Sequence, residues 1–228
     1  MRDHATEPPR FGDHRRTRIG LLGGSFNPAH AGHRHVAKLA LRRLGLDQVW
    51  LLVSPGNPLK AGAGMAPFAE RLASARAIAD GRRIVATGIE ARLGSPTRPH
   101  YTWTTLAQLR QRFPRAEFVW IMGADNLAQF PHWQRWTGIA GTMPVLVLPR
   151  PGWKARALAG QAANRLRGSR RAARAAHAFA GSKAPAWLYL PAPENTLSAT
   201  QLRRTRARPH KTELDDATSG AATEGASR

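Results

Sequence analysis

Two histidines three residues apart are the most informative pair in the chain. His30 and His33 stand in RIGLLGGSFNPAHAGHRHV, residues 18–36, downstream of Gly23 and Gly24. Imidazoles at this spacing share one side of a helix's first turn and can donate to the same phosphate oxygens. Glycines ahead of a helix N-terminus let a phosphate approach backbone N–H groups. The stretch therefore predicts a nucleotide phosphate site, against the alternative of an ordinary strand-to-helix turn with two surface histidines.

The elements that must position this pair are a strand ending near Gly23 and a helix starting near His30 and closed by Gly45. The same alternation continues along the chain and predicts an α/β fold, a Rossmann-like doubly wound parallel sheet. The expected strands are 19–22, 48–54, 83–87, 117–122, 144–148 and 187–190, and the expected later helices are 67–80, 101–113, 154–179 and a capped start within 196–206.

Polar groups follow several of these strands, and elements after parallel strands emerge at one edge of the sheet. Besides the opening loop they are Lys60, Asp125 in the turn GADN, and the turn from Ser198 to Arg203. Each alone has an ordinary reading as a solvated lysine, a turn acid or a surface arginine. Together they predict a polyphosphate site with an acid suited to ribose hydroxyls.

The sequence lacks the motifs that several other classes of nucleotide-binding or metal-binding protein require. The chain has no GxxxxGKS loop, no GxGxxG after its first strand and no cysteine. No paired-carboxylate metal cage is evident, so no protein metal site is expected. The best match is nucleotidyl transfer by direct in-line displacement, in which positioning and charge stabilisation supply catalysis. An attacking phosphate oxygen is already ionised and needs no general base.

The formal charge of +21 raises nucleic-acid binding as an alternative from another class. Residues 126–193 contain no acid, and nine arginines and lysines fall within 150–183. This block lacks the aromatic interleaving of a single-strand binder. A solvated arginine-rich surface on an enzyme for phosphorylated substrates is favoured, and nucleic acid is not expected as a partner.

We expect one domain at 18–206, a flexible N-terminal extension at 1–17 and a disordered tail at 207–228. No apolar run approaches the ~20 residues that a membrane span needs, and a cytoplasmic location is expected. A homo-oligomer is left open.

Four segments resemble the signatures of the HxGH nucleotidylyltransferases, and within them the bacterial nicotinate-nucleotide adenylyltransferases. GGSFNPAHAGH is similar to GG(S/T)F(D/N)PxHxGH, NPLK to a lysine loop, GADN to a GxD turn and LSATQLR to ISSTxxR. The resemblance covers about residues 18 to 206, and the first and last segments are specific as a pair.

The resemblance implies transfer of the adenylyl group of ATP to nicotinate mononucleotide, giving deamido-NAD and pyrophosphate, with Mg²⁺ carried on ATP. It implies that His30, His33 and Arg203 are catalytic. The implied ATP-binding residues are Gly23, Gly24, Ser25, Phe26, Lys60, Asp125, Ser198 and Thr200, and the implied mononucleotide-binding residues are Asn27, Tyr101, Thr102 and Trp133. Core packing is an equal alternative for Trp133.

Two positions depart from the family pattern. Ala199 replaces a serine of ISST, which removes one hydroxyl, and Asn27 replaces an aspartate, which removes a charge but keeps a turn-forming residue. The rivals within the superfamily are a nicotinamide mononucleotide or phosphopantetheine acceptor and cytidylyl transfer. A class I aminoacyl-tRNA synthetase is disfavoured because a KMSKS-like element is absent.

Overall fold

A seven-stranded parallel sheet runs through the centre of the molecule, in the order β3-β2-β1-β4-β5-β7-β6. The computed structural model describes residues 7–9, 11–56, 64–93 and 101–193. Long apolar runs form the central strands, as is typical of parallel strands that are covered on both faces. The strands are β1 (Arg18–Gly24), β2 (Gln48–Val53), β3 (Ile84–Thr87), β4 (Glu117–Gly123), β5 (Val145–Leu148), β6 (Arg170–Arg171) and β7 (Trp187–Tyr189).

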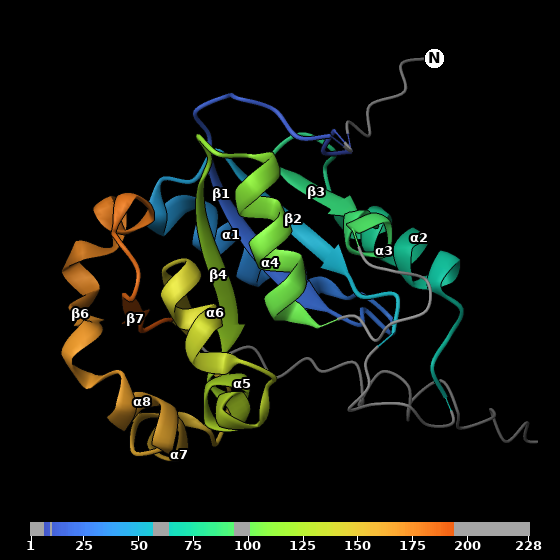
Figure 1. The fold of residues 1–228 in the computed structure, drawn as a ribbon. Helices are drawn as coiled ribbons and strands as arrows, with labels where there is room; N and C mark the ends of the chain where they lie inside the picture. Colours follow the sequence, from blue (N-terminus) through green and yellow to red (C-terminus); the bar gives the residue numbers. More distant parts are fainter. Residues whose placement is uncertain (1–6, 10, 57–63, 94–100, 194–228) are drawn as a thin grey trace, which may run out of the picture.

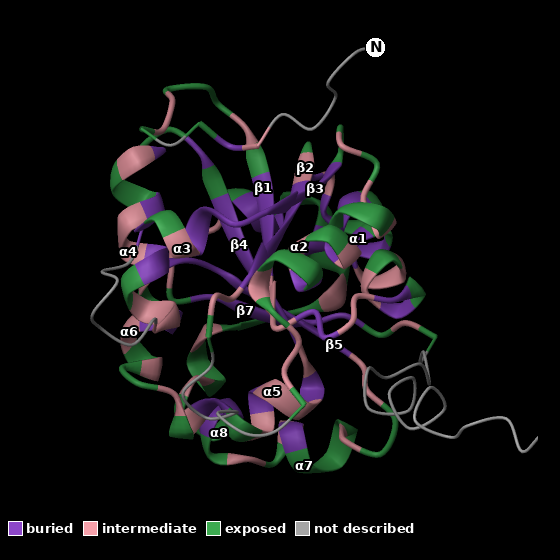
Figure 2. Ribbon diagram, turned by 90° about the vertical axis from the view of Figure 1, so that its right-hand side faces the viewer, coloured by how far each residue is buried: buried purple, intermediate pink, exposed green. Residues whose placement is uncertain are grey.

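Helices cover both faces of the sheet (Figure 1). One face packs against α1 (Ala31–Leu44), α2 (Phe68–Ile78) and the 3-10 helix η4 (Ala173–Gly181). The opposite face packs against α3 (Ile89–Leu93), α4 (Thr102–Arg112), α5 (Ala124–Gln129), η2 (Phe130–His132), α6 (Trp136–Thr142), α7 (Lys154–Leu158) and α8 (Gln161–Arg165). Figure 2 shows the buried residues concentrated in the sheet and on the helix sides facing it. The doubly wound α/β prediction is confirmed.

All six expected strands form close to their predicted bounds. The first helix ends as predicted, because Gly45 adopts a left-handed φ of 61° at its C-terminus. The helix expected across 154–179 is wrong. It is replaced by α7, α8, the 3-10 helix η3 (Arg167–Ser169), β6 and η4, since Gly160 and Gly168 interrupt a weakly amphipathic stretch and Arg170–Arg171 pair with β7 instead.

The segment before β1 lies against the domain. The carboxylate of Glu7 forms ion pairs with Arg76 of α2 and Arg92 of α3. Gly12, with a φ of 85°, sits so close to the backbone carbonyl of Arg112 in α4 that a Cβ would overlap it. These contacts join three helices, and nothing in the composition of residues 1–17 indicated them.

The order of strands places a topological switch point between β1 and β4, which pair with each other. The chain proceeds from β1 outward to β2 and β3, and then returns to the other side of β1 as β4. Connections therefore diverge from the carboxyl ends of β1 and β4, and a crevice at such a point is where open α/β sheets bind ligands.

Candidate active site

His30 and His33 form a reciprocal cap at the start of α1, directly after the loop that follows β1. The Nδ1 atom of His30 accepts a hydrogen bond of 3.1 Å from the N–H of Gly32. The Nδ1 atom of His33 accepts one of 3.2 Å from the N–H of His30. Because both Nδ1 atoms are acceptors, the neutral tautomer of each ring carries its hydrogen on Nε2. Both imidazoles can therefore donate an N–H to a ligand without losing the cap.

The surroundings favour the neutral form of both rings. Burial, followed by the positive charges of His30 and Arg150, lowers the pKa of His33 to about 3. Burial and then Arg150 also lower the pKa of His30. The two ring centroids lie 3.9 Å apart, too close for two imidazolium ions to be favourable. In the free protein the pair consequently acts as hydrogen-bond donors rather than as cations at neutral pH.

From the sequence, Gly23 was expected to let a phosphate approach the backbone. In the structure, Gly23 is required because Trp120 packs against it. A Cβ at Gly23 would overlap the six-membered ring of Trp120, a buried residue of β4. At Gly24 a Cβ would meet the ring of Phe26 at 3.3 Å, a tight contact with a single side chain. Phe26 itself has a φ of 47°, which is strained for a residue other than glycine. The loop after β1 is thus shaped by aromatic packing beneath it.

The segment GADN, expected as a turn, is the start of α5, whose first turn brings Asp125 close to Arg150, the second residue after β5. The Oδ1 atom of Asp125 is buried without a hydrogen-bond partner and lies 3.7 Å from the Nε atom of Arg150. A Cβ at Gly123 would overlap that carboxylate, so the glycine makes room for it. The Oδ1 atom of Asp125 therefore interacts with Arg150 through charge and forms no hydrogen bond. Sequence analysis did not select Arg150 as a site residue, although its place after a strand was an available signal.

Tyr101 and Thr102 stand at the N-terminus of α4. This helix leads into β4, so it begins at the edge of the sheet where the parallel strands end. The carbonyl of Tyr101 accepts hydrogen bonds from the N–H groups of Thr104 and Thr105, at 3.0 and 3.2 Å. These bonds order the first turn of α4, and this helix packs on the same face of the sheet as Trp133.

Trp133 is half-buried and follows η2. Its ring packs edge-on against Trp120 and Phe130, with centroids 6.3 and 5.5 Å apart. Trp120 thereby lies against both Gly23, at the end of β1, and Trp133. Packing accounts for part of the Trp133 surface, and the exposed remainder is free to meet a ligand.

Glu90 is a buried acid that sequence analysis missed. Its side chain belongs to α3, and 7% of the residue is exposed. Burial raises the pKa of the Glu90 carboxyl to about 7, partly offset by a hydrogen bond with the Thr105 side chain. Thr105 lies in the first turn of α4, so this acid borders the Tyr101–Thr102 region.

Comparison with known proteins agrees with this geometry. Residues 21–205 match the model of the cytidylyltransferase-like family. The chain is 60% identical over 186 residues to a probable nicotinate-nucleotide adenylyltransferase of Gluconobacter oxydans, covering 82% of this chain and 93% of that protein. Identity to another, of Gluconacetobacter diazotrophicus, is 55% over 198 residues, covering 87% and 90%. This chain belongs to the nicotinate-nucleotide adenylyltransferases.

The fold is also that of a solved enzyme of this kind. The nicotinic acid mononucleotide adenylyltransferase of Plasmodium falciparum, solved in complex with NaAD, aligns with a TM-score of 0.61 at 16% identity, covering 82% of each chain. At that identity the likeness concerns the fold alone. Family membership confirms the predicted enzyme class, an ATP-using nucleotidyltransferase of NAD biosynthesis.

Several residues expected to serve this adenylyltransferase lie outside the described residues, namely Lys60, Ser198, Thr200 and Arg203. Asn27 is described, and its amide bonds within the protein. Its Nδ2 donates to the carbonyl of Gly64 at 2.8 Å, and its Oδ1 accepts from the N–H of Ala66 at 3.2 Å. The roles of all these residues toward substrates stay predictions.

The described residues contain no group of three or more histidines and acids able to hold a metal ion. Within those same residues no helix has the length and apolarity to cross a membrane.

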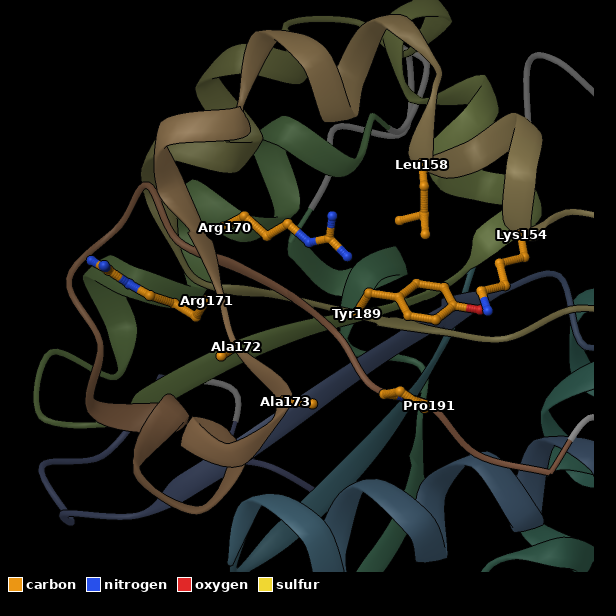
Figure 3. A pocket seen from close by; sticks show the side chains of 8 residues that line it. All are labelled: Lys154, Leu158, Arg170, Arg171, Ala172, Ala173, Tyr189 and Pro191. Carbon is orange, nitrogen blue, oxygen red and sulfur yellow. The ribbon is translucent and has the colours of Figure 1, made fainter.

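A cavity of about 510 Å³ opens between α7 and the β6–β7 edge of the sheet. In Figure 3 the side chain of Lys154 ends beside the hydroxyl of Tyr189, Arg170 is directed toward the space between them and α7, and Arg171 points away. None of the predicted site residues within the described part of the chain lines this cavity. Lys154, Arg170 and Arg171 bring part of the basic block of residues 150–183 to this cavity, and Tyr189 and Pro191 complete it from β7 and the segment after it.

Proposed function

We propose that the crevice after β1 and β4 binds MgATP, and that His30 and His33 contact its phosphates through their Nε2–H groups. The observation that carries this proposal is the pair of hydrogen bonds to Nδ1, which leaves Nε2 of each ring as the donor. Preorganised donors stabilise developing charge without reorganisation during the reaction. Arg150, whose positive charge acts on both rings, adds a cation on the same side.

The reaction is an in-line displacement at the α-phosphorus of ATP. A phosphate oxygen of nicotinate mononucleotide forms the new bond to phosphorus, the bond to the bridging oxygen breaks, and pyrophosphate leaves with its electron pair. No proton has to be removed from the attacking oxygen. The protein's part is to hold two anionic reactants in line and to neutralise their charge.

The remaining roles are distributed over both sides of the crevice. Asp125 accepts from the ATP ribose, which is supported by the place of its carboxylate directly after β4 and by an Oδ1 atom that has an ion pair with Arg150 but no hydrogen bond. Tyr101, Thr102 and Trp133 receive the mononucleotide, which their place at the same edge of the sheet supports. We keep Gly23, Gly24, Ser25, Phe26, Lys60, Ser198 and Thr200 as ATP contacts, Arg203 with the leaving pyrophosphate, and Asn27 beside the mononucleotide.

Mg²⁺ enters as part of the substrate MgATP. The described residues offer no cluster of ligands for a resident metal, and two phosphates plus water are ordinary Mg²⁺ ligands. We propose a cytoplasmic location, where ATP and the mononucleotide are available.

The deciding experiment supplies the purified full chain with MgATP and either nicotinate or nicotinamide mononucleotide, and follows pyrophosphate release and dinucleotide formation. We expect kcat/KM for the nicotinate to exceed that for the nicotinamide by ~10²-fold or more, because a site that pairs a carboxylate rejects the neutral amide. Equal rates would overturn the choice of acceptor, and no turnover with either would overturn the function.

A further inference from the structure

Arg71 of α2 is a buried arginine whose guanidinium, among the described residues, donates hydrogen bonds to backbone carbonyls alone. Only 3% of the residue is exposed. A buried guanidinium is normally paired with a carboxylate, yet among the described residues no carboxylate forms an ion pair with it. Burial lowers its pKa from the ordinary arginine value. Burying a guanidinium without a carboxylate costs free energy. Hydrogen bonds to four backbone carbonyls offset part of that cost here.

These carbonyls belong to the two loops that border the crevice. The Nη1 atom of Arg71 donates to the carbonyls of Ser25, at 2.8 Å, and Ser54, at 2.6 Å. Nη2 donates to Pro55 at 3.0 Å, and Nε donates to Ala66 at 2.9 Å. Ser25 follows β1, and Ser54 and Pro55 follow β2. The planar guanidinium, with its five fixed donors, therefore ties together loops from neighbouring strands.

Two other side chains reinforce the same junction. Asn27 bonds to the backbone of Gly64 and Ala66, as described above. Ser74, one turn after Arg71 on α2, accepts from the N–H of Ala29 at 3.1 Å through its Oγ atom. The loop between β1 and α1 is thus held from the α2 side along its length. In irregular loops such side-chain bonds replace the ladder that orders a strand.

The hydrogen bond from Arg71 to the Ser25 carbonyl sets which way the next backbone N–H of the loop points. In a trans peptide the C=O and the N–H point in opposite directions. Since the Ser25 carbonyl points at Arg71, the N–H of Phe26 in the same peptide points away from Arg71. The neighbouring carbonyl of Gly24 is taken by the N–H of Ser54 at 3.0 Å. The Ser25 carbonyl is in this way turned toward Arg71 of α2 and the Gly24 carbonyl toward the end of β2, so neither oxygen is left to repel a phosphate.

We propose that Arg71 is a positioning residue for adenylyl transfer, which holds the loop after β1 so that its N–H groups, rather than its carbonyls, face the ATP phosphates. Arg71 itself does not contact substrate in this arrangement. This inference rests on the proposed use of that loop for ATP. The inference goes beyond the proposed function by naming Arg71, a buried cation on α2, as the group that orients the loop.

The test compares Arg71→Lys and Arg71→Ala with Arg76→Ala, a control on the same helix whose side chain forms only a surface ion pair. Lysine keeps the charge but cannot supply donors to four carbonyls. For Arg71→Lys we expect kcat to fall by ~10²-fold with a raised KM for ATP, since small displacements of a phosphate loop have effects of that size. The KM for the mononucleotide should change less, and Arg76→Ala should keep the wild-type kcat.

Chemical rescue separates positioning from general stability. Millimolar guanidinium chloride, far below denaturing concentrations, should raise the rate of Arg71→Ala several-fold, whereas the same concentration of sodium chloride should not. If Arg71→Ala does not fold, Arg71→Lys decides alone. A wild-type kcat in Arg71→Lys, or a folded Arg71→Ala that guanidinium fails to rescue, would overturn the inference.

A binding measurement keeps this test apart from the proposed function. The affinity for a non-reacting ATP analogue is measured by calorimetry for the wild type and for Arg71→Lys. A wild type that binds the analogue without turning over either mononucleotide would contradict the proposed function alone. Weaker analogue binding by Arg71→Lys would then still support the positioning role, and unchanged binding would count against it.

Discussion

The Nδ1 atom of His33 accepts a hydrogen bond of 3.2 Å from the backbone N–H of His30, the residue that itself caps α1. Each ring therefore has two tasks that use different nitrogen atoms. Nδ1 stabilises the start of the helix, and Nε2 is the donor that we propose contacts the ATP phosphates. A substitution of either histidine mixes both effects unless the replacement preserves one of them.

Replacing His33 by alanine or by glutamine separates these tasks. Glutamine is a natural residue for the third helical position of a capping box, because its side chain can reach back to the cap N–H. We expect His33→Ala to lose turnover and about 1 kcal/mol of stability, the usual value of a cap. His33→Gln should recover that stability but not turnover. Steady-state rates and urea unfolding check both, and near-wild-type turnover of His33→Gln would remove the imidazole from catalysis.

The response to acid provides an independent prediction for the same residue. The pKa of His33 is about 3 in the folded protein and near 6.5 when unfolded, so the unfolded chain binds more protons between these values. Its neutral ring contributes stability above pH 6.5, and that contribution falls as the pH drops toward 3. His33→Gln should show a shallower loss of stability over this range. Urea midpoints measured from pH 7 to pH 4 give the slopes, and identical slopes would be evidence against a buried neutral ring.

Glu90→Gln should act in the opposite direction. The folded pKa of about 7 exceeds the ordinary 4.5, so Glu90 favours the folded state fully below pH 4.5 and loses that contribution as the pH rises through 7. The glutamine side chain carries no charge, and we expect the variant to be more stable than wild type by about 1–3 kcal/mol at pH 8 and equal to it near pH 4.5. Urea unfolding at both pH values tests this. Glu70→Gln, at an exposed site, is the matched control and should show no comparable pH-dependent gain.

Gly23→Ala should be costly because Trp120 occupies the space of the new methyl group. Overpacking of this kind destabilises by about 1–3 kcal/mol. Trp120→Phe removes the ring that collides, so the double variant should lose less stability than the sum of the two single variants. Urea unfolding of all four proteins measures this coupling. Strict additivity would show that the ring does not constrain Gly23.

Gly123→Ala and Asp125→Ala should have overlapping effects on ATP. The new Cβ would displace the Asp125 carboxylate, so both variants remove the same acceptor. Each should raise the KM for ATP by ~10-fold or more, the value of a hydrogen bond to a charged group. The double variant should be little worse than either single one. Initial rates at varied ATP give the values, and fully multiplied effects would separate the glycine from the carboxylate.

Sequence patterns specified most of the fold because the core strands are continuous apolar runs, such as VWLLV in β2 and EFVWIM in β4. They failed at residues 154–179, where alanine and arginine favour a helix but two glycines and pairing with β7 prevail. Local propensity carries no information about a strand partner that is distant in sequence.

The residues of the candidate site also fall into those that a local sequence pattern indicates and those that only the tertiary structure reveals. The histidine pair and Asp125 stand in recognisable local patterns. Arg71 and Glu90 do not, because their roles depend on burial and on partners 46 and 15 residues away, respectively. An arginine on a helix and a glutamate after a short strand look like surface residues until the tertiary structure is known.

The bridge from Glu7 to Arg76 and Arg92 has a practical consequence for protein engineering. Cutting the chain at Arg18, where β1 begins, would leave these two arginines without their shared carboxylate and remove the glycine that seats against Arg112. Affinity tags and fusion partners are therefore better attached ahead of Glu7 than in place of residues 7–17. Versions shortened at the N-terminus should begin no later than Glu7.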